Sequence, residues 1–332
     1  MNKPLHCQVF LLVPVAVILF FSGVVIIPAY AQEGRTKIRI SYPNTSICCL
    51  ALFAAQQWKI FEQNGLDVES IQMRSQAANS ALASGDIHYV AGVGPNSVAA
   101  TLRGIPSKAV WFASERLIYS VMVRPELKSL KDLRGKRIGI TGLGGTSDVA
   151  LRIALEAVGE NFKDFTVVAL GAPQLMSGLE SGAIEAAQLN SPFIYHAKKK
   201  GFREVLDIGA YVQMPLGGLT ASAAAIQNRS VELKRVLRSL QTAKKMLLQS
   251  KEKGIDLIMR TIRVDREVAG EMFVDNEKSS TGNGVPSREG MEQIVKSLQM
   301  LGQFTGKKIP FEEITDIRLA REVAKELGYK VD

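Results

Sequence analysis

Residue types that carry most enzyme chemistry are scarce in this chain. Its 332 residues include three cysteines and three histidines, and aromatic residues make up 7% of them. Beyond residue 31, His88 and His196 stand alone, so neither belongs to a metal-binding pair or a catalytic triad. The G-x-S-x-G and H-E-x-x-H motifs are missing, and the shortage of aromatics disfavours a sugar or polymer site. We therefore expect a protein that is not an enzyme and that holds neither a cofactor nor a metal.

Two cysteines follow residue 31, and they are neighbours, Cys48 and Cys49. A disulfide between adjacent residues is strained, and no further cysteine is left for a long-range bridge. The fold must therefore be held together by its core. Partly buried free thiols are one interpretation of the pair, and a vicinal disulfide or a redox role stays open as the other.

The first 31 residues have the pattern of an export signal. Lys3 supplies a positive charge, residues 9–28 are almost wholly apolar, and Ala29-Tyr30-Ala31 matches an A-x-A cleavage site. We expect cleavage before Gln32, which predicts a periplasmic protein. The apolar stretch is long for a signal, so an uncleaved membrane anchor is the alternative.

The excess of basic residues is modest and spread along the chain. The formal net charge is +9, and removal of Lys3 with the signal lowers it to +8. The densest basic run, residues 198–200, is typical of a solvated helix end. We therefore expect no nucleic-acid partner, although the charge suits an anionic ligand, lipid or protein. About 300 residues after the signal give ample core for one large or two medium domains.

One short phrase occurs twice, 97 residues apart. Residues 81–87 read ALASGDI and residues 178–184 read GLESGAI, and a proline follows each copy at the same offset. In both copies we expect a helix that ends at the glycine, Gly85 or Gly182, in the left-handed conformation. A short apolar strand and a helix that begins at the proline should follow. The spacing is too long for a solenoid repeat and predicts two similar α/β lobes.

Strands and helices alternate along the chain, which favours a mostly parallel sheet in each lobe. The expected strands are 37–42, 66–73, 87–93, 107–112, 117–123, 137–141, 165–170, 184–189 and 219–226. The expected helices are 50–61, 76–83, one opened by Pro95, one that ends at Val158, 172–180, 231–249, and segments near 265–276, 287–301 and 316–326.

The predicted fold class is therefore α/β with two lobes. Residues 36–117 together with 224–332 form lobe one, and residues 123–220 form lobe two. If the C-terminal helices return to lobe one, two extended crossings join the lobes, near Tyr119 and near Ala223. Such a pair is a natural hinge, and a small ligand would bind in the cleft between the lobes.

Candidate binding residues follow the strands at their carboxyl ends, where open α/β sheets hold ligands. The best local site is the glycine-rich turn of Gly144, Gly145, Thr146 and Ser147, because free N–H groups at a helix start favour an anionic or polar group. The turn lacks the lysine of a P-loop and the third glycine of a dinucleotide fingerprint, and its alternative role is to cap the helix. The remaining candidates are ordinary turn residues at three other strand ends: Asn44, Thr45, Ser46, Gly94, Asn96, Asn190 and Ser191.

Four phrases, in this order and spacing, resemble a known family. They are GLDVE at 65–69, ALASGDI at 81–87, LKDLRGKRIG at 130–139 and SPF at 191–193. The chain is similar, over about residues 36–250, to the solute-binding proteins of nitrate/sulfonate/taurine-type ABC importers, whose superfamily also includes thiamine-pyrimidine-precursor binders and synthases. The resemblance implies a type II periplasmic-binding fold, in which two lobes close on a solute and deliver it to a membrane permease.

Some positions depart from the family pattern. Many relatives carry Trp-Glu before the second proline, where this chain has Asn190-Ser191. An aromatic wall and a carboxylate are therefore missing, and Cys48-Cys49 matches no family motif. These departures leave the class of ligand open.

The sequence thus predicts a monomeric, exported solute-binding protein for a small anion or amphoteric molecule, with an ABC importer permease as its partner. A synthase-like enzyme of the thiamine-pyrimidine type is a second hypothesis, which the export signal and the poor histidine inventory oppose. A ligand-sensing accessory module for a membrane partner is a third, and the long helical C-terminal segment is its one hint.

Overall fold

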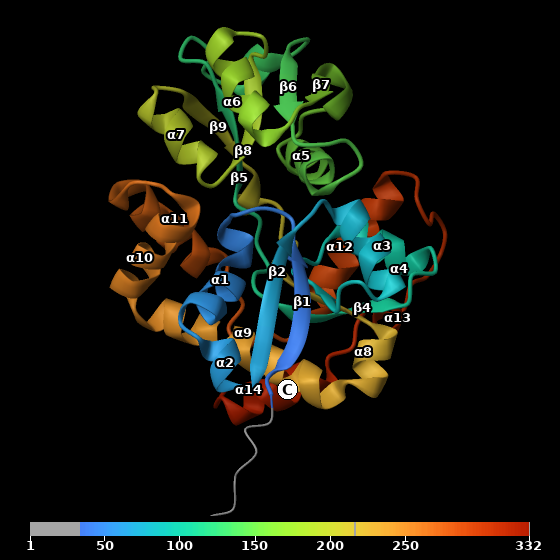
Figure 1. Ribbon diagram of the computed structural model, residues 1–332. Helices are drawn as coiled ribbons and strands as arrows, with labels where there is room; N and C mark the ends of the chain where they lie inside the picture. The colour runs from blue at the N-terminus through green and yellow to red at the C-terminus, as the bar shows by residue number, and fades with distance from the viewer. Residues whose placement is uncertain (1–33, 216, 332) are drawn as a thin grey trace, which may run out of the picture. The chain divides into compact units, whose positions relative to one another are not determined.

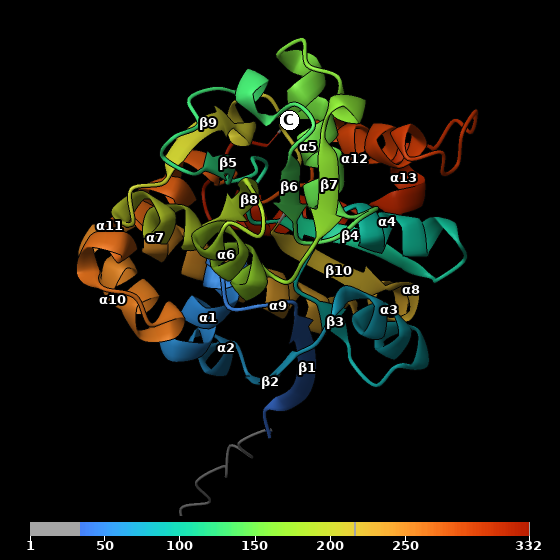
Figure 2. The same cartoon turned by 90° about the horizontal axis from the view of Figure 1, so that it is seen from above.

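The computed structural model describes residues 34–215 and 217–331, which form two five-stranded sheets covered by helices (Figures 1 and 2). The predicted export signal and its alternative, an uncleaved anchor, lie outside the described residues. Within the described part, none of the helices is both long and apolar enough to span a bilayer.

The first sheet has the strand order β2-β1-β3-β10-β4. Strands β1 (Thr36–Tyr42), β2 (Leu66–Gln72) and β3 (Tyr89–Val90) are parallel to one another. Strand β10 (Gly218–Ser222) inserts antiparallel between β3 and β4 (Ser107–Phe112).

The second sheet repeats this arrangement, in the order β7-β6-β8-β5-β9. Strands β6 (Arg137–Ile140), β7 (Thr166–Ala169) and β8 (Ala186–Asn190) are parallel. Strand β5 (Tyr119–Val123) lies antiparallel between β8 and β9 (Arg203–Asp207). The fourth strand in each order, β10 or β5, is thus antiparallel to its neighbours, and the chain enters it directly after crossing from the other sheet.

The duplicated phrase forms the same turn in both halves. Helices α3 (Ser75–Ser84) and α6 (Ala172–Ser181) end at Gly85 and Gly182, whose φ angles are 82° and 77°. After each glycine the chain turns back, so that Ile87 N donates to Ala81 O at 3.2 Å and Ile184 N donates to Gly178 O at 3.1 Å. The predicted left-handed helix ends are therefore confirmed, and the repeated letters correspond to a repeated hydrogen-bond pattern.

Helices cover both faces of each sheet (Figure 1). Apolar residues of α1 (Leu50–Gln57) and α9 (Ser230–Gln249) pack on one face of the first sheet, and those of α4 (Pro95–Leu102) and α12 (Arg288–Met300) pack on the other. On the second sheet, α5 (Thr146–Ala157) covers one face, while α6 and α7 (Phe193–Lys199) cover the other. The C-terminal helices therefore return to the first sheet. The remaining helices are α2 (Ile60–Gln63), α8 (Ala223–Asn228), α10 (Lys251–Ile262), α11 (Arg266–Ser279), α13 (Phe311–Ile314) and α14 (Arg318–Glu326).

The structure corrects the end of lobe two. The predicted strand 219–226 is wrong, because β10 ends at Ser222 and α8 follows, with Ser222 Oγ accepting a hydrogen bond from Ala225 N at 3.2 Å. Since β10 belongs to the first sheet, the second crossing lies before Gly218 and not near Ala223. The range 123–220 therefore extends three residues too far.

Other differences have local causes. The predicted helix 50–61 is broken at Lys59, which adopts a left-handed φ of 56° between α1 and α2. Strand β9 and helix α10 were not expected. Strand β9 has only two apolar residues, Val205 and Leu206. Helix α10 has apolar residues at helical spacing, Ile255, Ile258, Met259 and Ile262, and this signal was overlooked.

Candidate functional site

A cavity of about 160 Å³ lies where the carboxyl ends of strands from the two sheets meet. The loops that follow β1 and β3 supply most of its wall, and Tyr119, Thr146 and Asn190 come from the second half of the chain. An engineered apolar cavity of similar volume in another protein holds benzene, so the size fits a small solute. The full lining is Ser41, Tyr42, Pro43, Asn44, Ser46, Cys48, Met73, Ser75, Ala78, Val90, Ala91, Gly92, Val93, Gly94, Asn96, Ser97, Tyr119, Thr146 and Asn190.

Three helix N-termini contribute to this cavity. Ser75 begins α3, Gly94 precedes α4, and Thr146 begins α5, and no side chain caps any of the three helices. A Cβ atom built on Gly94 would lie 3.4 Å from Thr146 Oγ1, so the starts of α4 and α5 face each other closely. Their first-turn N–H groups and dipoles favour a negative or electron-rich group between them.

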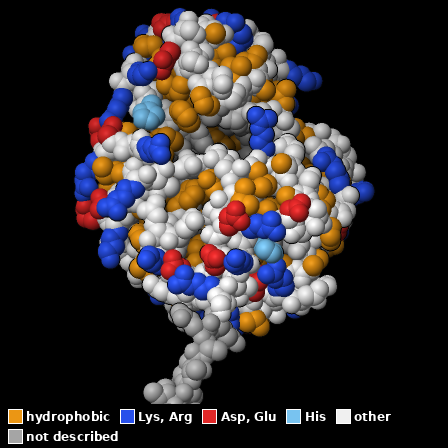
Figure 3. Space-filling model, in the orientation of Figure 1, with side chains coloured by type: hydrophobic (Ala, Val, Ile, Leu, Met, Phe, Trp, Pro, Cys, Tyr) orange, Lys and Arg blue, Asp and Glu red, His pale blue; other side chains and the backbone are white. Residues whose placement is uncertain are grey.

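Among the residues that the structure describes, the cavity lining contains hydrogen-bonding side chains but no lysine, arginine, histidine, aspartate or glutamate. Asparagine and serine side chains supply most of its polar atoms. The face seen in Figure 3 is hollowed between its upper and lower parts, and the visible walls of the hollow are mostly neutral, with basic side chains at the rim. Any charge recognition inside the cavity must therefore come from backbone dipoles and neutral donors.

One buried hydroxyl in the wall has no partner in the described protein. Ser41 lies on β1 with no exposed surface, and its Oγ makes no hydrogen bond. A buried polar atom without a partner costs free energy. Because Ser41 lines the cavity, a bound molecule is a ready partner for this hydroxyl.

A short polar chain runs along the loop after β1. Ser46 Oγ donates to Asn44 Oδ1 at 2.6 Å and lies 3.1 Å from Cys48 Sγ, which lies 3.3 Å from Cys49 Sγ. Both cysteines are free thiols; Cys48 is half-buried in the cavity wall and Cys49 is buried. The hydrogen bond from Cys49, more than any other contact, lowers the pKa of Cys48 and raises that of Cys49.

The structure brings together some of the candidate residues and not others. Those that line the cavity are Asn44, Ser46, Gly94, Asn96, Thr146 and Asn190. Thr45, Gly144, Gly145, Ser147 and Ser191 do not line it. Ser147 Oγ accepts from Thr141 Oγ1 at 2.9 Å and donates to Gly142 O at 3.1 Å, so its hydroxyl closes its own turn. Ser191 is buried, with 1% of its surface exposed.

Several residues of the wall were not among the candidates from the sequence. Ser41 and Tyr42 are the last residues of β1, and Tyr119 begins β5. These positions were predicted only as parts of strands, because the pattern of a strand does not show whether its end lines a cavity. Ser75 and Ser97 lie in first turns of helices, where a serine that caps the helix and a serine that faces a ligand give the same sequence pattern.

The two crossings between the sheets lie side by side. Ala113 N donates to Gly217 O at 2.9 Å, and Gly217 N donates to Ser114 Oγ at 3.1 Å. Ala113 and Ser114 leave β4 for β5, while Gly217 comes directly before β10. The expected pair of extended crossings is therefore present, with the first near Tyr119 as predicted.

The residues described hold no group of three or more His, Cys, Asp or Glu side chains that could bind a metal. The fold is that of the periplasmic binding proteins. The periplasmic nitrate-binding protein of Synechocystis PCC 6803 superposes with a TM-score of 0.74 at 16% identity, over 88% of this chain and 89% of that one. The periplasmic aliphatic sulphonate-binding protein of Escherichia coli gives 0.72 at 17% identity, over 86% and 99%.

The sequence comparisons agree with this class. A protein of Brucella abortus (strain 2308), provisionally described as a binding protein, is 24% identical over 256 residues, which are 72% of this chain and 76% of that protein. The model of the NMT1/THI5-like family matches residues 48–254, more than half of the chain. The chain belongs to the NMT1/THI5-like family, and the expected family resemblance and periplasmic-binding fold are confirmed.

Proposed function

We propose that this protein is an exported solute-binding protein that captures a small anionic or amphoteric solute and delivers it to the permease of an ABC importer. The observation that carries the proposal is the cavity at the strand ends, in which three uncapped helix N-termini meet with no charged side chain. A sulfonate, nitrate-like or carboxylate group would accept hydrogen bonds there from N–H and hydroxyl groups. Captured this way, the solute is held by many moderate contacts and can be released when the site opens.

The proposal includes no catalysis and no cofactor. General acid–base chemistry needs a titratable group beside the reacting atom, and the described part of the lining contains no histidine, carboxylate or lysine. The two crossings at Ala113 and Gly217 would serve as the hinge. We infer that the protein acts as a monomer on the outer side of the inner membrane, where a permease receives the solute.

The most direct test is native mass spectrometry of gently purified protein, which should detect a carried-over small molecule. A thermal-shift panel of nitrate, sulfonates, carboxylates and pyrimidines then ranks the classes. Stabilisation by an anion supports the proposal, and stabilisation by pyrimidines alone would replace the anion with a thiamine-pyrimidine precursor. No shift with any solute, together with measurable binding to a membrane protein, would favour an accessory module.

A matched pair of variants tests the start of α5. Thr146 lines the cavity, whereas Thr166 lies exposed on β7, away from it. Loss of one hydrogen bond to a charged group costs about 1.5–3 kcal/mol, so Thr146→Val should weaken solute binding by about 10–100-fold. Thr166→Val should leave the affinity unchanged in the same isothermal titration. Equal affinities of the two variants would remove the helix start from the binding site.

A further inference from the structure

The two cysteines differ in access although they are neighbours in sequence. They form a turn, η1 (Ile47–Cys49), between β1 and α1. Cys48 lines the cavity, while Cys49 has 3% of its surface exposed and packs behind it. Their sulfur atoms are 3.3 Å apart. A molecule that enters the cavity therefore meets Cys48 first and has no direct route to Cys49.

Their chemical environments differ in the same sense. Cys48 Sγ lies 3.1 Å from the Ser46 hydroxyl, and its hydrogen bond with Cys49 lowers the pKa of the Cys48 thiol. That hydrogen bond and burial raise the pKa of Cys49. The thiolate is the reactive form of cysteine, so the accessible thiol is also the more nucleophilic one, and the shielded thiol is positioned to react second.

We propose that Cys48 and Cys49 form a dithiol modification site in the cavity wall, in which Cys48 exchanges with a small disulfide and Cys49 then resolves the product. In the first step the Cys48 thiolate attacks one sulfur of the small disulfide, whose S–S bond breaks and releases a thiolate that takes up the proton lost by Cys48. In the second step the Cys49 thiol loses its proton, and its sulfur attacks Cys48 Sγ. This expels the second small thiolate, which is protonated in turn. The pair is oxidised by two electrons and the small disulfide is reduced to two thiols.

A second observation indicates that the cavity admits a polar molecule. The unpartnered hydroxyl of Ser41 is fully buried in the same wall as Cys48. Tyr119, from the second half of the chain, also lines the cavity, and burial, followed by the charge of Cys48, raises the pKa of its phenol. A group attached to Cys48 would therefore lie between walls from both halves. Adjacent-residue disulfides are strained and belong to the labile, readily reduced class, which suits reversible modification.

The test uses the reduced full chain and the oxidised form of β-mercaptoethanol, a small neutral disulfide, with intact-mass analysis. Cys7 is replaced by serine in every protein, so that only the pair can react. The parent protein should lose two hydrogens and keep no adduct. Cys49→Ser should retain one mercaptoethanol adduct, because nothing resolves it, and Cys48→Ser should show no reaction.

The outcomes separate cleanly. An adduct on Cys48→Ser, a lasting adduct on the parent protein, or no reaction in any protein would overturn the site. Alanine versions of both variants and cooperative thermal unfolding guard against misfolding. The reaction is measured without solute, so it does not depend on the proposed function. If a solute is then found and fails to slow the reaction of Cys49→Ser, the solute does not occupy this cavity, while the dithiol site stands.

Discussion

Ser41 has a buried hydroxyl without a partner in the described protein, and it lines the cavity. A substitution of Ser41 therefore tests both the stability of the fold and the binding of a solute. Ser41→Ala removes a buried polar atom that has no hydrogen bond in the described protein, so the free energy of unfolding should stay equal or rise by up to about 1 kcal/mol. Solute affinity should fall in the same variant, because the hydroxyl would lose its role as a ligand contact.

Ser107 supplies the matched control for this prediction. It is also buried, with 4% of its surface exposed, but it is hydrogen-bonded to Thr101 Oγ1 at 3.0 Å. Ser107→Ala should therefore lower the free energy of unfolding by about 1 kcal/mol and leave solute affinity unchanged. Urea unfolding and isothermal titration separate the two variants. A loss of stability in Ser41→Ala equal to that in Ser107→Ala would mean that the Ser41 hydroxyl has a partner.

Lys244 is a buried lysine, and no carboxylate of the described residues forms an ion pair with it. It lies on α9 with 3% of its surface exposed, and its Nζ donates to Thr281 O and, at 2.5 Å, to Thr281 Oγ1. Burial lowers the pKa of Lys244 to about 7. In the unfolded chain the pKa returns to about 10.4, so between about pH 7 and 10 the unfolded state binds more protons than the folded state.

The free energy of unfolding should therefore gain a contribution that rises with pH across this window, with a slope of up to about 1.4 kcal/mol per pH unit. Lys244→Met should flatten the slope measured by urea unfolding. Lys245→Met is the control, because Lys245 is the sequence neighbour and its Nζ donates to Leu327 O at 2.9 Å. A slope that is the same in both variants would contradict the lowered pKa.

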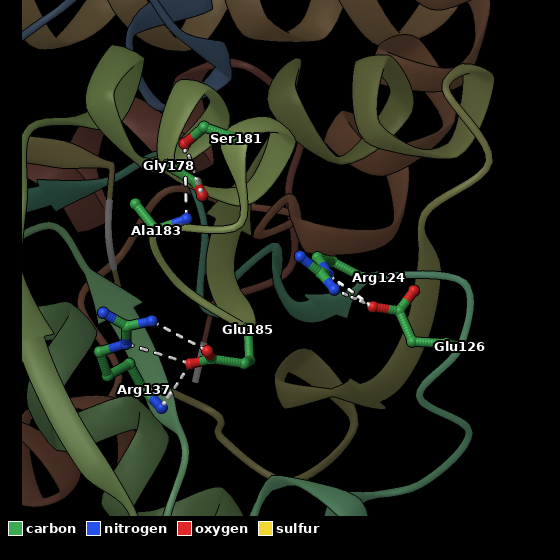
Figure 4. Close-up of polar contacts among 7 residues, drawn as sticks. All are labelled: Arg124, Glu126, Arg137, Gly178, Ser181, Ala183 and Glu185. Carbon is green, nitrogen blue, oxygen red and sulfur yellow. Dashed lines mark hydrogen bonds and ion pairs between the residues drawn. The ribbon is translucent and has the colours of Figure 1, made fainter.

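At the scale of elements, the two copies of the repeated turn bind an equivalent backbone N–H group with different side chains. In the second copy, Arg137 N donates to Glu185 Oε2 at 3.0 Å, and the Arg137 guanidinium pairs with the same carboxylate (Figure 4). This pairing lowers the pKa of Glu185 to about 2. In the first copy the equivalent backbone group, Arg39 N, donates to His88 Nδ1 at 2.8 Å. His88 comes directly before β3, and its ring nitrogen holds the backbone of β1, so this contact is structural.

The glycines of these turns should respond to substitution differently from a glycine inside a helix. A Cβ at Gly85 meets nothing within 4 Å, so Gly85→Ala measures the left-handed strain alone, about 1–2 kcal/mol of lost stability. Gly182→Ala should cost about the same, because the nearby atom is the flexible end of Arg124.

Gly270 is the control. It lies within α11, also with nothing within 4 Å of a built Cβ. Gly270→Ala should raise the free energy of unfolding by about 0.5–1 kcal/mol, because alanine favours the helix. Urea unfolding measures all three. A neutral Gly85→Ala would show that the turn tolerates a side chain.

Much of the element order could be predicted because glycine stops, helix-starting prolines and apolar periods are local signals. Asn44, Asn96 and Asn190 could be predicted near the cavity for the same reason: Asn44 follows β1, Asn96 lies in the first turn of α4, and Asn190 ends β8. Ser41 and Tyr119 could not be found, because the sequence does not say which buried strand end faces a cavity and which faces the core. The position of Ser147 could not be predicted for a related reason. A hydroxyl at a helix start can bond to its own loop or to a ligand, and in the folded chain that of Ser147 bonds to its own loop.

At the scale of the whole molecule, the two sheets differ in how their strands are spread along the chain. Strands β5 to β9 occupy the continuous range 119–207, whereas the first sheet needs β10, which follows the entire second sheet in sequence. A fragment of residues 117–212 should therefore unfold cooperatively on heating, as followed by circular dichroism. A fragment of residues 35–113 should not, because β4 has no neighbouring strand without β10. Cooperative unfolding of the shorter N-terminal piece would contradict this order.

Because β10 completes the first sheet, the order of synthesis determines which sheet can fold first. A chain that emerges N-terminus first presents β1 to β4 before their sheet can be completed, and the half that appears second is the first able to finish folding. Strand β4 stays unpaired until β10 (Gly218–Ser222) has been synthesised. The insertion that ties the two halves together in the finished protein thus also makes the N-terminal strands the part most in need of protection from aggregation while the chain is incomplete.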